Sequence, residues 1–570
     1  MQRQHGACAK RGRNPVCPRA AAHGFHRLRL HCAVTIYGTS EVHHWTRRYI
    51  HGGMPHGIDP LGGRTRMALL MGIDLGTSGL KTIIIDEAGE VKALSKRSYI
   101  FDTPVGGFAE QDPDTWWTAC KETIREAIAT CGCNAKEIAA ISFSGQMHGL
   151  VPLDDDLQPV RSAILHCDAR SGKQVEHMRQ KLGLEGTRSL VMNPIYTGFL
   201  LPSLLWVREN EPERYDKIRY VCLPKDYLKL KLTGELSTDY SDASATLAFD
   251  IRENKWSQPI LELFQLPLTL FPRCCSTTER AGEISIKAAE ETGLRAGTIV
   301  AAGGGDQVMQ GIGNGMVNVG DATVNIGSSG QVSFQIDRPV LNPELNTNMF
   351  CGYRQGRWIL FGATMSAGLS LEWWHRNSGN IDYETLDRAV AQVPPGCDGL
   401  LFLPYLNGER TPHLDPDLRA AFLGLNVGAT HAHMTRAVME GVAFSLLQSI
   451  EICGSLGFRA QSLVASGGAA RSKPWLQLQA DIYNLPLRAA NAKEQAGVGA
   501  AIAAGVCAGV YKDLAEGCSA AVSYRDEIIQ PDAKRHDTYM EYYTLYKEAA
   551  QINRPLLNRL ATLGRGERIK

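Results

Sequence analysis

The sequence lacks the features that mark membrane, disulfide-bonded or fibrous proteins. It contains no run of about 18 apolar residues, and its longest candidate, residues 496–510, is short and rich in Gly and Ala, so we expect no membrane partner. Its 15 cysteines include no C-x-x-C pair. This argues against a structural zinc site and favours a reduced, cytoplasmic protein. A hydrophobic content of 44% with 21% charged residues excludes disorder and predicts a packed globular chain.

Net charge is almost absent, but its distribution is uneven. The 60 Lys+Arg and 59 Asp+Glu leave a formal charge of +1, yet residues 1–66 hold eleven basic residues against two acids. This leader has no sustained apolar periodicity, so we expect it to form no packed element. A transit peptide or a basic arm for nucleic acid has such a composition. Because an apolar strand begins directly after Arg66, we interpret residues 1–66 as an extension outside the fold, with no nucleic-acid partner for the protein.

Strand and helix patterns alternate after the leader. Residues 68–73 and 80–85 are apolar runs separated by a glycine turn, and a second turn at Gly89 leads into residues 90–95, which predicts a meander of three strands. Asp114 suits the N-cap of a helix that runs to Thr130, and residues 138–144 form a further apolar run. This alternation indicates an α/β architecture.

The opening pattern recurs 251 residues later. Residues 321–326 and 331–336 are apolar runs around Gly327-Ser328-Ser329-Gly330, as the first two strands lie around Gly76-Thr77-Ser78-Gly79. We therefore predict two α/β lobes, residues 67–313 and residues 314–570.

The two glycine-hydroxyl turns suit phosphate binding. Their backbone N–H groups can approach an anion closely, and the hydroxyls add donors. Asp74, at the end of the first strand, offers a carboxylate for Mg²⁺ beside phosphate oxygens. No G-x-x-x-x-G-K-[ST] motif is present, so the chain is not a P-loop protein.

Two further glycine clusters follow apolar strands. Asp306 comes directly after three glycines, where it could be a general base toward a substrate hydroxyl or, equally, the cap of the following helix. Gly467 and Gly468 lie between a strand and a helix, a geometry that suits an adenosine or phosphate group at a helix N-terminus.

With these motifs in place, the chain resembles the FGGY carbohydrate kinases, and among them most closely the xylulokinases, from about residue 71 to about residue 545. The resemblance rests on long, ordered matches: G-I-D-L-G-T-S-G-L-K (72–81), G-Q-M-H-G (145–149), L-P-K-D-Y-L (223–228), G-G-G-D (303–306), L-P-Y-L-N-G-E-R-T-P-H (403–413) and A-F-L-G-L to M-E-G (421–441). It implies two actin-like, ribonuclease H-like lobes with a nucleotide and sugar cleft between them. It also implies ATP and Mg²⁺ as cofactors, a ketopentose as the second substrate, and allows a homodimer.

Residue roles follow from the resemblance. Asp306 would be the general base for in-line transfer of the γ-phosphoryl group of ATP to D-xylulose, giving D-xylulose 5-phosphate. Asp74 would be a second catalytic residue, near Mg²⁺ through water. The sugar would contact Gln146, Met147, His148 and Asp306, and the nucleotide would contact Thr77, Ser78, Gly327, Ser328, Ser329, Gly467 and Gly468.

The chain departs from the xylulokinase pattern at one place that bears on specificity. Where that pattern has W-N-D-x-R, this sequence has His166-Cys167-Asp168-Ala169-Arg170. The departure motivates an alternative substrate, another ketose or a polyol such as ribulose. A non-kinase nucleotide switch of actin-like fold is a further alternative, which the Met147-His148 pair and Asp306 argue against.

Overall fold

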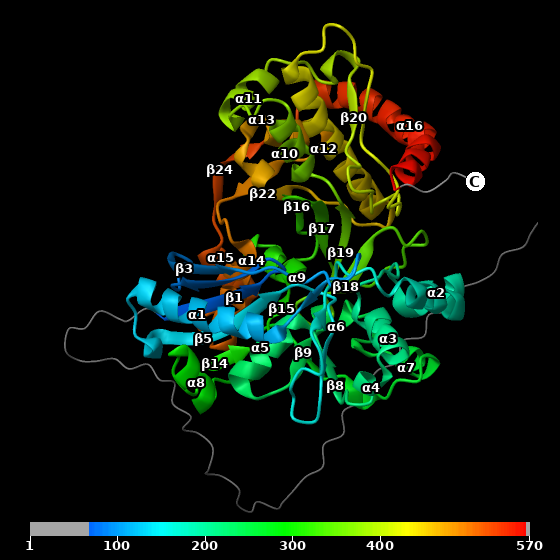
Figure 1. The fold of residues 1–570 in the computed structure, drawn as a ribbon. Helices are drawn as coiled ribbons and strands as arrows, with labels where there is room; N and C mark the ends of the chain where they lie inside the picture. The colour runs from blue at the N-terminus through cyan, green and yellow to red at the C-terminus, as the bar shows by residue number, and fades with distance from the viewer. Residues whose placement is uncertain (1–67, 566–570) are drawn as a thin grey trace, which may run out of the picture. The chain divides into compact units, whose positions relative to one another are not determined.

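The structure, a computed structural model, describes residues 68–565, and the interpretation of residues 1–66 lies outside the described residues. Two seven-stranded sheets organise this part of the chain. Figure 1 shows the sheet that contains β1 in the lower part of the view and the sheet that contains β16 above it.

The first sheet is built around the predicted meander. Its order is β13-β14-β5-β1-β2-β3, with β15 also paired to β5. β1 lies antiparallel to β2 and parallel to β5, and β2 is antiparallel to β3. The strands are β1 (Leu69–Leu75), β2 (Gly79–Ile85), β3 (Val91–Ser98), β5 (Ile138–Gly145), β13 (Arg280–Glu283), β14 (Ile299–Ala301) and β15 (Gly304–Gly305).

The second sheet repeats this topology. β16 lies antiparallel to β17 and parallel to β22, β17 is antiparallel to β19, and β22 is parallel to β23. The strands are β16 (Ala322–Ile326), β17 (Gly330–Ile336), β18 (Asn348–Cys351), β19 (Trp358–Thr364), β22 (Leu463–Gly467), β23 (Leu487–Ala490) and β24 (Tyr524–Ile529). The prediction of two similar α/β halves, made from two short turns, is confirmed by the matching strand orders.

Helices and short strand pairs complete each half. The first half contains α1 (Pro113–Cys131), α2 (Gly172–Gly186), α3 (Leu200–Asn210), α4 (Pro212–Tyr215), α5 (Pro224–Thr233), α6 (Tyr240–Ser244), α7 (Gln258–Leu263), α8 (Ile286–Thr292) and α9 (Asp306–Gly313). The second contains α10 (Gly368–Asn377), α11 (Tyr383–Val390), α12 (His431–Ser455), α13 (Lys473–Tyr483), α14 (Gln495–Cys507), α15 (Leu514–Ala521) and α16 (Ala533–Gly564). The pairs are β4 (Glu110–Gln111) with β7 (Ala163–Ile164), β6 (Val151–Leu153) with β8 (Tyr220–Cys222), β9 (Ser237–Asp239) with β12 (Arg273–Cys275), β10 (Phe249–Asp250) with β11 (Lys255–Trp256), and β20 (Leu401–Leu403) with β21 (Ala421–Leu423).

The Gly/Ala-rich helix α14 comes from the second half of the chain but packs on the first sheet. It contacts β1, β5 and α9, and Figure 1 shows it beside β1. A Cβ atom on Gly499 would collide with the carbonyl oxygen of Met309, and one on Gly72 would collide with that of Gly497. Small residues therefore permit the close approach, as expected for residues 496–510 from composition.

The start of α1 differs from the sequence prediction. The cap is Asp112, whose side chain accepts a hydrogen bond from the Asp114 backbone N–H, and Asp114 lies inside the first turn. Pro113 occupies the first helical position, where a missing N–H costs no hydrogen bond. The cap is thus the residue before the proline rather than the residue after it.

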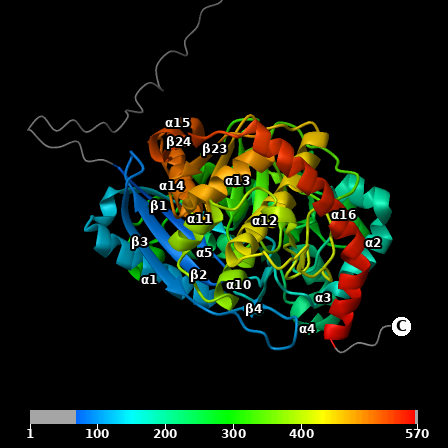
Figure 2. The same ribbon diagram turned by 90° about the horizontal axis from the view of Figure 1, so that it is seen from above.

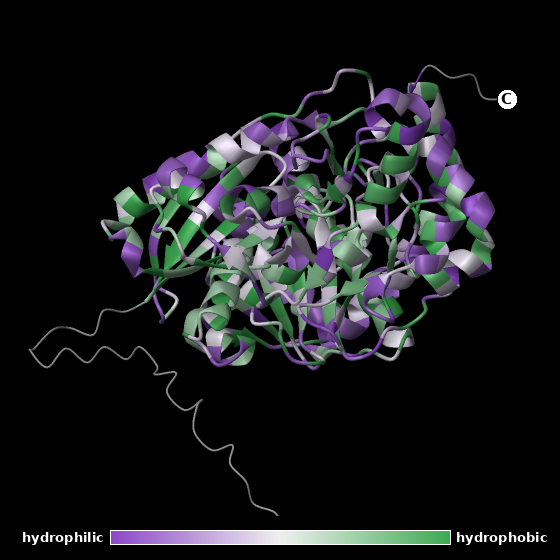
Figure 3. Cartoon of the chain, turned by 90° about the horizontal axis from the view of Figure 1, so that it is seen from below, coloured by the Kyte–Doolittle hydropathy of each residue, from purple (hydrophilic) through white to green (hydrophobic). Residues whose placement is uncertain are grey.

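Helix α12 is the central helix of the second half. By length and composition it could cross a membrane, but 78% of its apolar window is buried inside the protein, as in the core helix of a globular domain. Figure 3 shows hydrophobic residues gathered on interior strands and hydrophilic residues on the surrounding helices.

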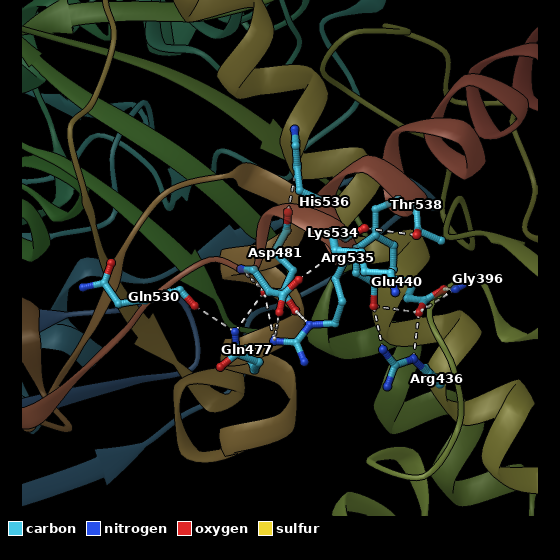
Figure 4. A network of polar contacts seen from close by, with 12 residues as sticks. Gly396, Arg436, Glu440, Gln477, Asp481, Gln530, Lys534, Arg535, His536 and Thr538 are labelled. Atoms are coloured by element: carbon cyan, nitrogen blue, oxygen red, sulfur yellow. Dashed lines mark hydrogen bonds and ion pairs between the residues drawn. The ribbon is translucent and has the colours of Figure 1, made fainter.

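The long helix α16 lies along one side of the second half (Figure 2) and is fixed by buried polar contacts. Arg436 donates to the Glu440 carboxylate at 2.8 Å, and Tyr539 of α16 donates to the same carboxylate at 3.0 Å. Beside them, Arg535 forms an ion pair with Asp481 at 2.7 Å (Figure 4). These contacts link α16 to α12 and α13.

Candidate active site

A cavity of about 350 Å³ collects side chains from both halves of the chain. Six of its lining residues were predicted as site residues: Thr77, Gln146, Met147, His148, Asp306 and Ser329. The strand ends, the helix α9 and the second glycine-hydroxyl turn therefore meet at one place, although they are separated by up to 250 residues of sequence.

Asp306 reaches this cavity from a tight glycine turn. Gly303 has a φ of 77°, and a Cβ there would approach the carbonyl oxygen of Phe143 to 2.6 Å; one on Gly305 would approach Met147 Sδ to 2.8 Å. Only glycines let the turn pass so close to β5. Asp306 is the first residue of α9 and Gly305 is its cap, with no side-chain cap bond, so Asp306 does not act as the cap.

The two acids of the site influence each other. Burial, together with the nearby carboxylate of Asp74, raises the pKa of Asp306 to about 7. Burial also raises the pKa of Asp74, which a hydrogen bond from Ser144 Oγ at 2.7 Å partly offsets. Asp74 is not among the cavity's lining residues but lies directly beside them at the end of β1.

Behind the Asp306 turn lies a cluster of fully buried charged side chains. Lys225 Nζ is 2.6 Å from Asp226, 2.8 Å from Asp239 and 3.1 Å from Asp242. Burial raises the pKa of Asp242 well above its ordinary value. A cluster of this kind is stable only when its charges are paired, so these side chains hold α5, α6 and β9 in fixed positions.

This cluster reaches the catalytic turn through two hydrogen bonds. Lys229 Nζ donates to the carbonyl oxygen of Ala302 at 3.2 Å, and the Gly305 N–H donates to Ser241 Oγ at 2.9 Å. Ser241 is itself hydrogen-bonded to Asp239 through its hydroxyl. Lys225 and Asp226, from the matched segment 223–228, lie behind the turn rather than in the cavity.

The predicted sugar motif is held in a strained but well-braced conformation. His148 has a φ of 77°, and its ring stacks on Phe199 with centroids 3.9 Å apart. Its Nδ1 lies 2.9 Å from the carbonyl oxygen of Ala245; because a carbonyl only accepts, Nδ1 carries the proton and Nε2 is left as an acceptor. Burial lowers the pKa of His148 to about 3, so the ring is neutral.

The first glycine-hydroxyl turn contacts this sugar motif. Thr77 Oγ1 donates to Gln146 Oε1 at 3.0 Å, and the Gln146 N–H donates to the Leu75 carbonyl at 2.8 Å. The Gln146 amide nitrogen is buried and has no protein partner. Ser78, in the same turn, is exposed and does not line this cavity, so its contact with a nucleotide stays a prediction.

The second turn lies between two cavities. Ser329 faces the cavity of Asp306, whereas Gly327 and Ser328 line a neighbouring cavity of about 590 Å³ that also contains Gly468. Gly467 lines a further hollow beside it. In this segment Gly467 has a positive φ. Ala469 does not, so its side chain causes no backbone strain.

Several lining residues had no signal in the sequence. In the larger cavity these are Glu372, Tyr383, Asp387 and Trp475; in the smaller one they are Tyr196, Phe199, Gln331, Asn348 and Arg410. Arg410 belongs to the matched segment 403–413, which could have indicated it. The others come from loops, helices and the strands β17 and β18, which only tertiary packing brings together.

The candidate site offers a metal ion isolated carboxylates rather than a cluster of protein ligands. Among residues 68–565, no group of three or more His, Cys, Asp or Glu side chains could hold a metal ion alone. Within the same residues, Asp74 Oδ2 makes no hydrogen bond. One free carboxylate oxygen next to a phosphate site suits Mg²⁺, which usually binds one or two carboxylates together with substrate phosphates and water.

Comparison with known proteins agrees with this geometry. The N-terminal domain of the FGGY family of carbohydrate kinases matches residues 69–313, and its C-terminal domain matches residues 322–508. The chain belongs to this family. It is therefore an ATP-dependent carbohydrate kinase, with the predicted two-lobed α/β fold.

Relatives of known identity cover most of this kinase. The xylulose kinase of Staphylococcus epidermidis is 37% identical over 496 residues, which are 86% of this chain and 98% of that protein. The xylulose kinase of Bacillus subtilis is 35% identical over 482 residues, 84% of this chain and 96% of its own. The crystal structure of a xylulose kinase from Brucella ovis has a TM-score of 0.80 at 33% identity, covering 86% of this chain and all of that one.

Proposed function

We propose that this kinase phosphorylates D-xylulose on its 5-hydroxyl with ATP, giving D-xylulose 5-phosphate. The observation that carries the proposal is the position of Asp306, which shares one cavity with Gln146, Met147 and His148 and with Ser329 of the second turn. The same turn lines the larger cavity through Gly327 and Ser328. A nucleotide in the larger cavity could thus extend its terminal phosphate past this turn toward a sugar beside Asp306.

The chemistry assigned to the residues follows from their protonation states. An ionised Asp306 accepts the proton of the attacking hydroxyl, and a pKa of about 7 suits a base that works near neutral pH. His148 Nε2 accepts a hydrogen bond from a second sugar hydroxyl. Phosphoryl transfer passes through a loose transition state, so these contacts contribute mainly by orienting the sugar in line with the γ-phosphate.

The phosphates are held by backbone N–H groups and hydroxyls. We assign this role to Thr77, Ser328 and Ser329, with Gly467 and Gly468 beside the adenosine. Asp74 Oδ2 would hold Mg²⁺, directly or through water. Bound there, the metal neutralises charge on the β- and γ-phosphates. Lobe boundaries at residues 313 and 314, a homodimer and a cytoplasmic location complete the proposal; the free cysteines of residues 68–565 suit a reducing compartment.

The decisive test is Asp306→Ala, assayed by ADP release and by nucleotide binding. We expect turnover of D-xylulose to fall by about 10²–10⁴-fold while ATP binding stays within about twofold, because the carboxyl acts only on the sugar hydroxyl. Retained turnover would contradict the role as base. A panel of ketopentoses and polyols in the same assay tests the alternative substrates, and a clear preference for one of them would contradict D-xylulose.

A further inference from the structure

His166 is the one of the two unusual residues that reaches the sugar cavity. Its ring lines the cavity beside Tyr196 and Arg410, whereas Cys167 is exposed and lines no part of it. The departure from the xylulokinase pattern is therefore a change of one side chain in the site, and Cys167 is a neighbour at the protein surface.

The backbone around His166 is fixed from two sides. The Asp168 carboxylate accepts a hydrogen bond from the Ala109 N–H at 2.6 Å, and Leu165 donates to the Ala109 carbonyl at 3.0 Å. Opposite, Gly198 has a φ of 75° and packs so closely that a Cβ on it would lie 3.0 Å from His166 Cα. The next residue, Phe199, stacks on His148. One loop thus braces both histidines of the cavity.

The ring of His166 is neutral, and neither of its nitrogens has a hydrogen-bond partner within residues 68–565. Burial, together with the Arg410 guanidinium, lowers its pKa to about 4. Its Nδ1 is enclosed and makes no hydrogen bond. Nε2 has no protein partner within residues 68–565 and is not enclosed. A buried N–H without an acceptor is rarer in proteins than an unused acceptor, so the favoured tautomer carries its proton on Nε2.

The two histidines therefore offer opposite hydrogen-bonding groups to a ligand. His148 presents an acceptor, and His166 presents a donor. A 2-ketopentose closes its five-membered ring through the 5-hydroxyl, so a sugar phosphorylated at that hydroxyl must be in the open-chain form with a free carbonyl at C2. A carbonyl oxygen accepts hydrogen bonds and donates none. It matches the donor of His166 and the adjacent guanidinium of Arg410.

We propose that His166 is a specificity-determining residue, whose Nε2–H donates a hydrogen bond to the carbonyl oxygen of an open-chain 2-ketose. This inference rests on the proposed function and decides between its ketose and polyol alternatives. A polyol carries a hydroxyl at C2 whose own hydrogen faces two donors, so it binds less well. Sites built to pair a particular polar group reject analogues that lack it because their own buried groups stay unpaired.

The test compares D-xylulose with xylitol, its C2-reduced counterpart, in the wild-type enzyme and two substituted forms. His166→Phe removes the donor and keeps an aromatic ring; His166→Gln keeps a donor near the position of Nε2. We expect the phenylalanine substitution to lower kcat/KM for D-xylulose about 10- to 100-fold and for xylitol less than about threefold. The glutamine form should keep most of the preference. Cys167→Ser is the matched control and should leave both substrates unchanged.

The outcomes separate the two proposals. Equal losses on ketose and polyol would show that His166 only packs, and no loss would show that it does not touch the sugar; either overturns this inference while the kinase activity stands. Wild-type enzyme that turns over no ketopentose would overturn the proposed function itself. If the phenylalanine form does not fold, ¹⁵N NMR of wild-type protein labelled in its histidines, assigned with His166→Gln, still decides. A proton found on Nδ1 of His166 overturns the inference.

Discussion

The carboxyl of Asp306 destabilises the folded protein whenever it is ionised. Its ordinary pKa is 3.8, and burial raises the pKa to about 7 in the folded state. When the pKa of an acid is higher in the folded state than in the unfolded chain, the free energy of unfolding falls as pH rises from the unfolded pKa to the folded pKa. The full difference corresponds to about 4 kcal/mol. Of this, the free energy of unfolding loses about 2.5 kcal/mol between pH 5 and pH 8.

Asp306→Asn removes this pH-dependent loss, because an amide is neutral in both states. Relative to wild type, the substituted protein should therefore gain about 2.5 kcal/mol more stability at pH 8 than at pH 5. Urea unfolding at the two pH values, without nucleotide or Mg²⁺, measures this. Asp155→Asn is the control, since the Asp155 side chain is 76% exposed and its ion pair with Arg219 contributes little. A stability difference that is the same at both pH values would refute the raised pKa of Asp306.

Three other substitutions test the supports of the site. Ser241→Ala removes the acceptor of the Gly305 N–H, so kcat should fall about tenfold while KM for sugar and for ATP stays within about twofold. The control is Ser244→Ala in the same helix, whose hydroxyl accepts from the Cys351 N–H instead and whose loss should leave kcat within about twofold. Equal effects of the two substitutions would contradict a positioning role for Ser241. Gly499→Ala should lower the free energy of unfolding by at least about 2 kcal/mol, because its Cβ meets Met309, whereas Gly454→Ala in α12, with open space around it, should be neutral or stabilising in the same urea measurement. Glu440→Gln should lower the free energy of unfolding by about 3 kcal/mol, measured in urea, because it leaves Arg436 without its buried charge partner (Figure 4). The activity of the folded fraction should be unchanged. A decrease in the free energy of unfolding below about 1 kcal/mol would show that the contact is dispensable.

The fold was predictable where local sequence decides it. Strand patterns separated by glycine turns predicted β1, β2, β3 and β5 of the first sheet and β16 and β17 of the second, because period and turn residues act within a few positions. The cap of α1 was placed two residues too late, since Asp112 and Asp114 are equally good caps and only the position of Pro113 distinguishes them. The packing of α14 on β1 has no local signal in the sequence. Which sheet it covers depends on contacts more than 400 residues apart, such as the Lys81–Glu494 ion pair.

The residues of the candidate site, like the elements of the fold, were predictable where a local motif carries them. Asp306, Gln146 and His148 carry local motifs, and the structure brings them to one cavity. Tyr196 and Phe199 lie in a loop with no motif of its own, and their position follows from Gly198, which must fit against the backbone of His166. Ser78, the exposed residue of the first glycine-hydroxyl turn, does not line this cavity, so its contact with the nucleotide stays a prediction.

The arrangement of α14 also changes the meaning of a two-lobed chain. Leu70 and Ile83 of the first sheet belong to one buried apolar cluster with Val498, Ala501 and Ile502 of α14. Residues 67–313 therefore lack the helix that covers one face of their own sheet, although they correspond closely to the family's N-terminal domain. The helix that carries Asp306 packs on α14 as well. Because Asp306 and the sheet bearing the first glycine-hydroxyl turn share this partner, the geometry of the candidate site in the first half is completed only when the second half has folded.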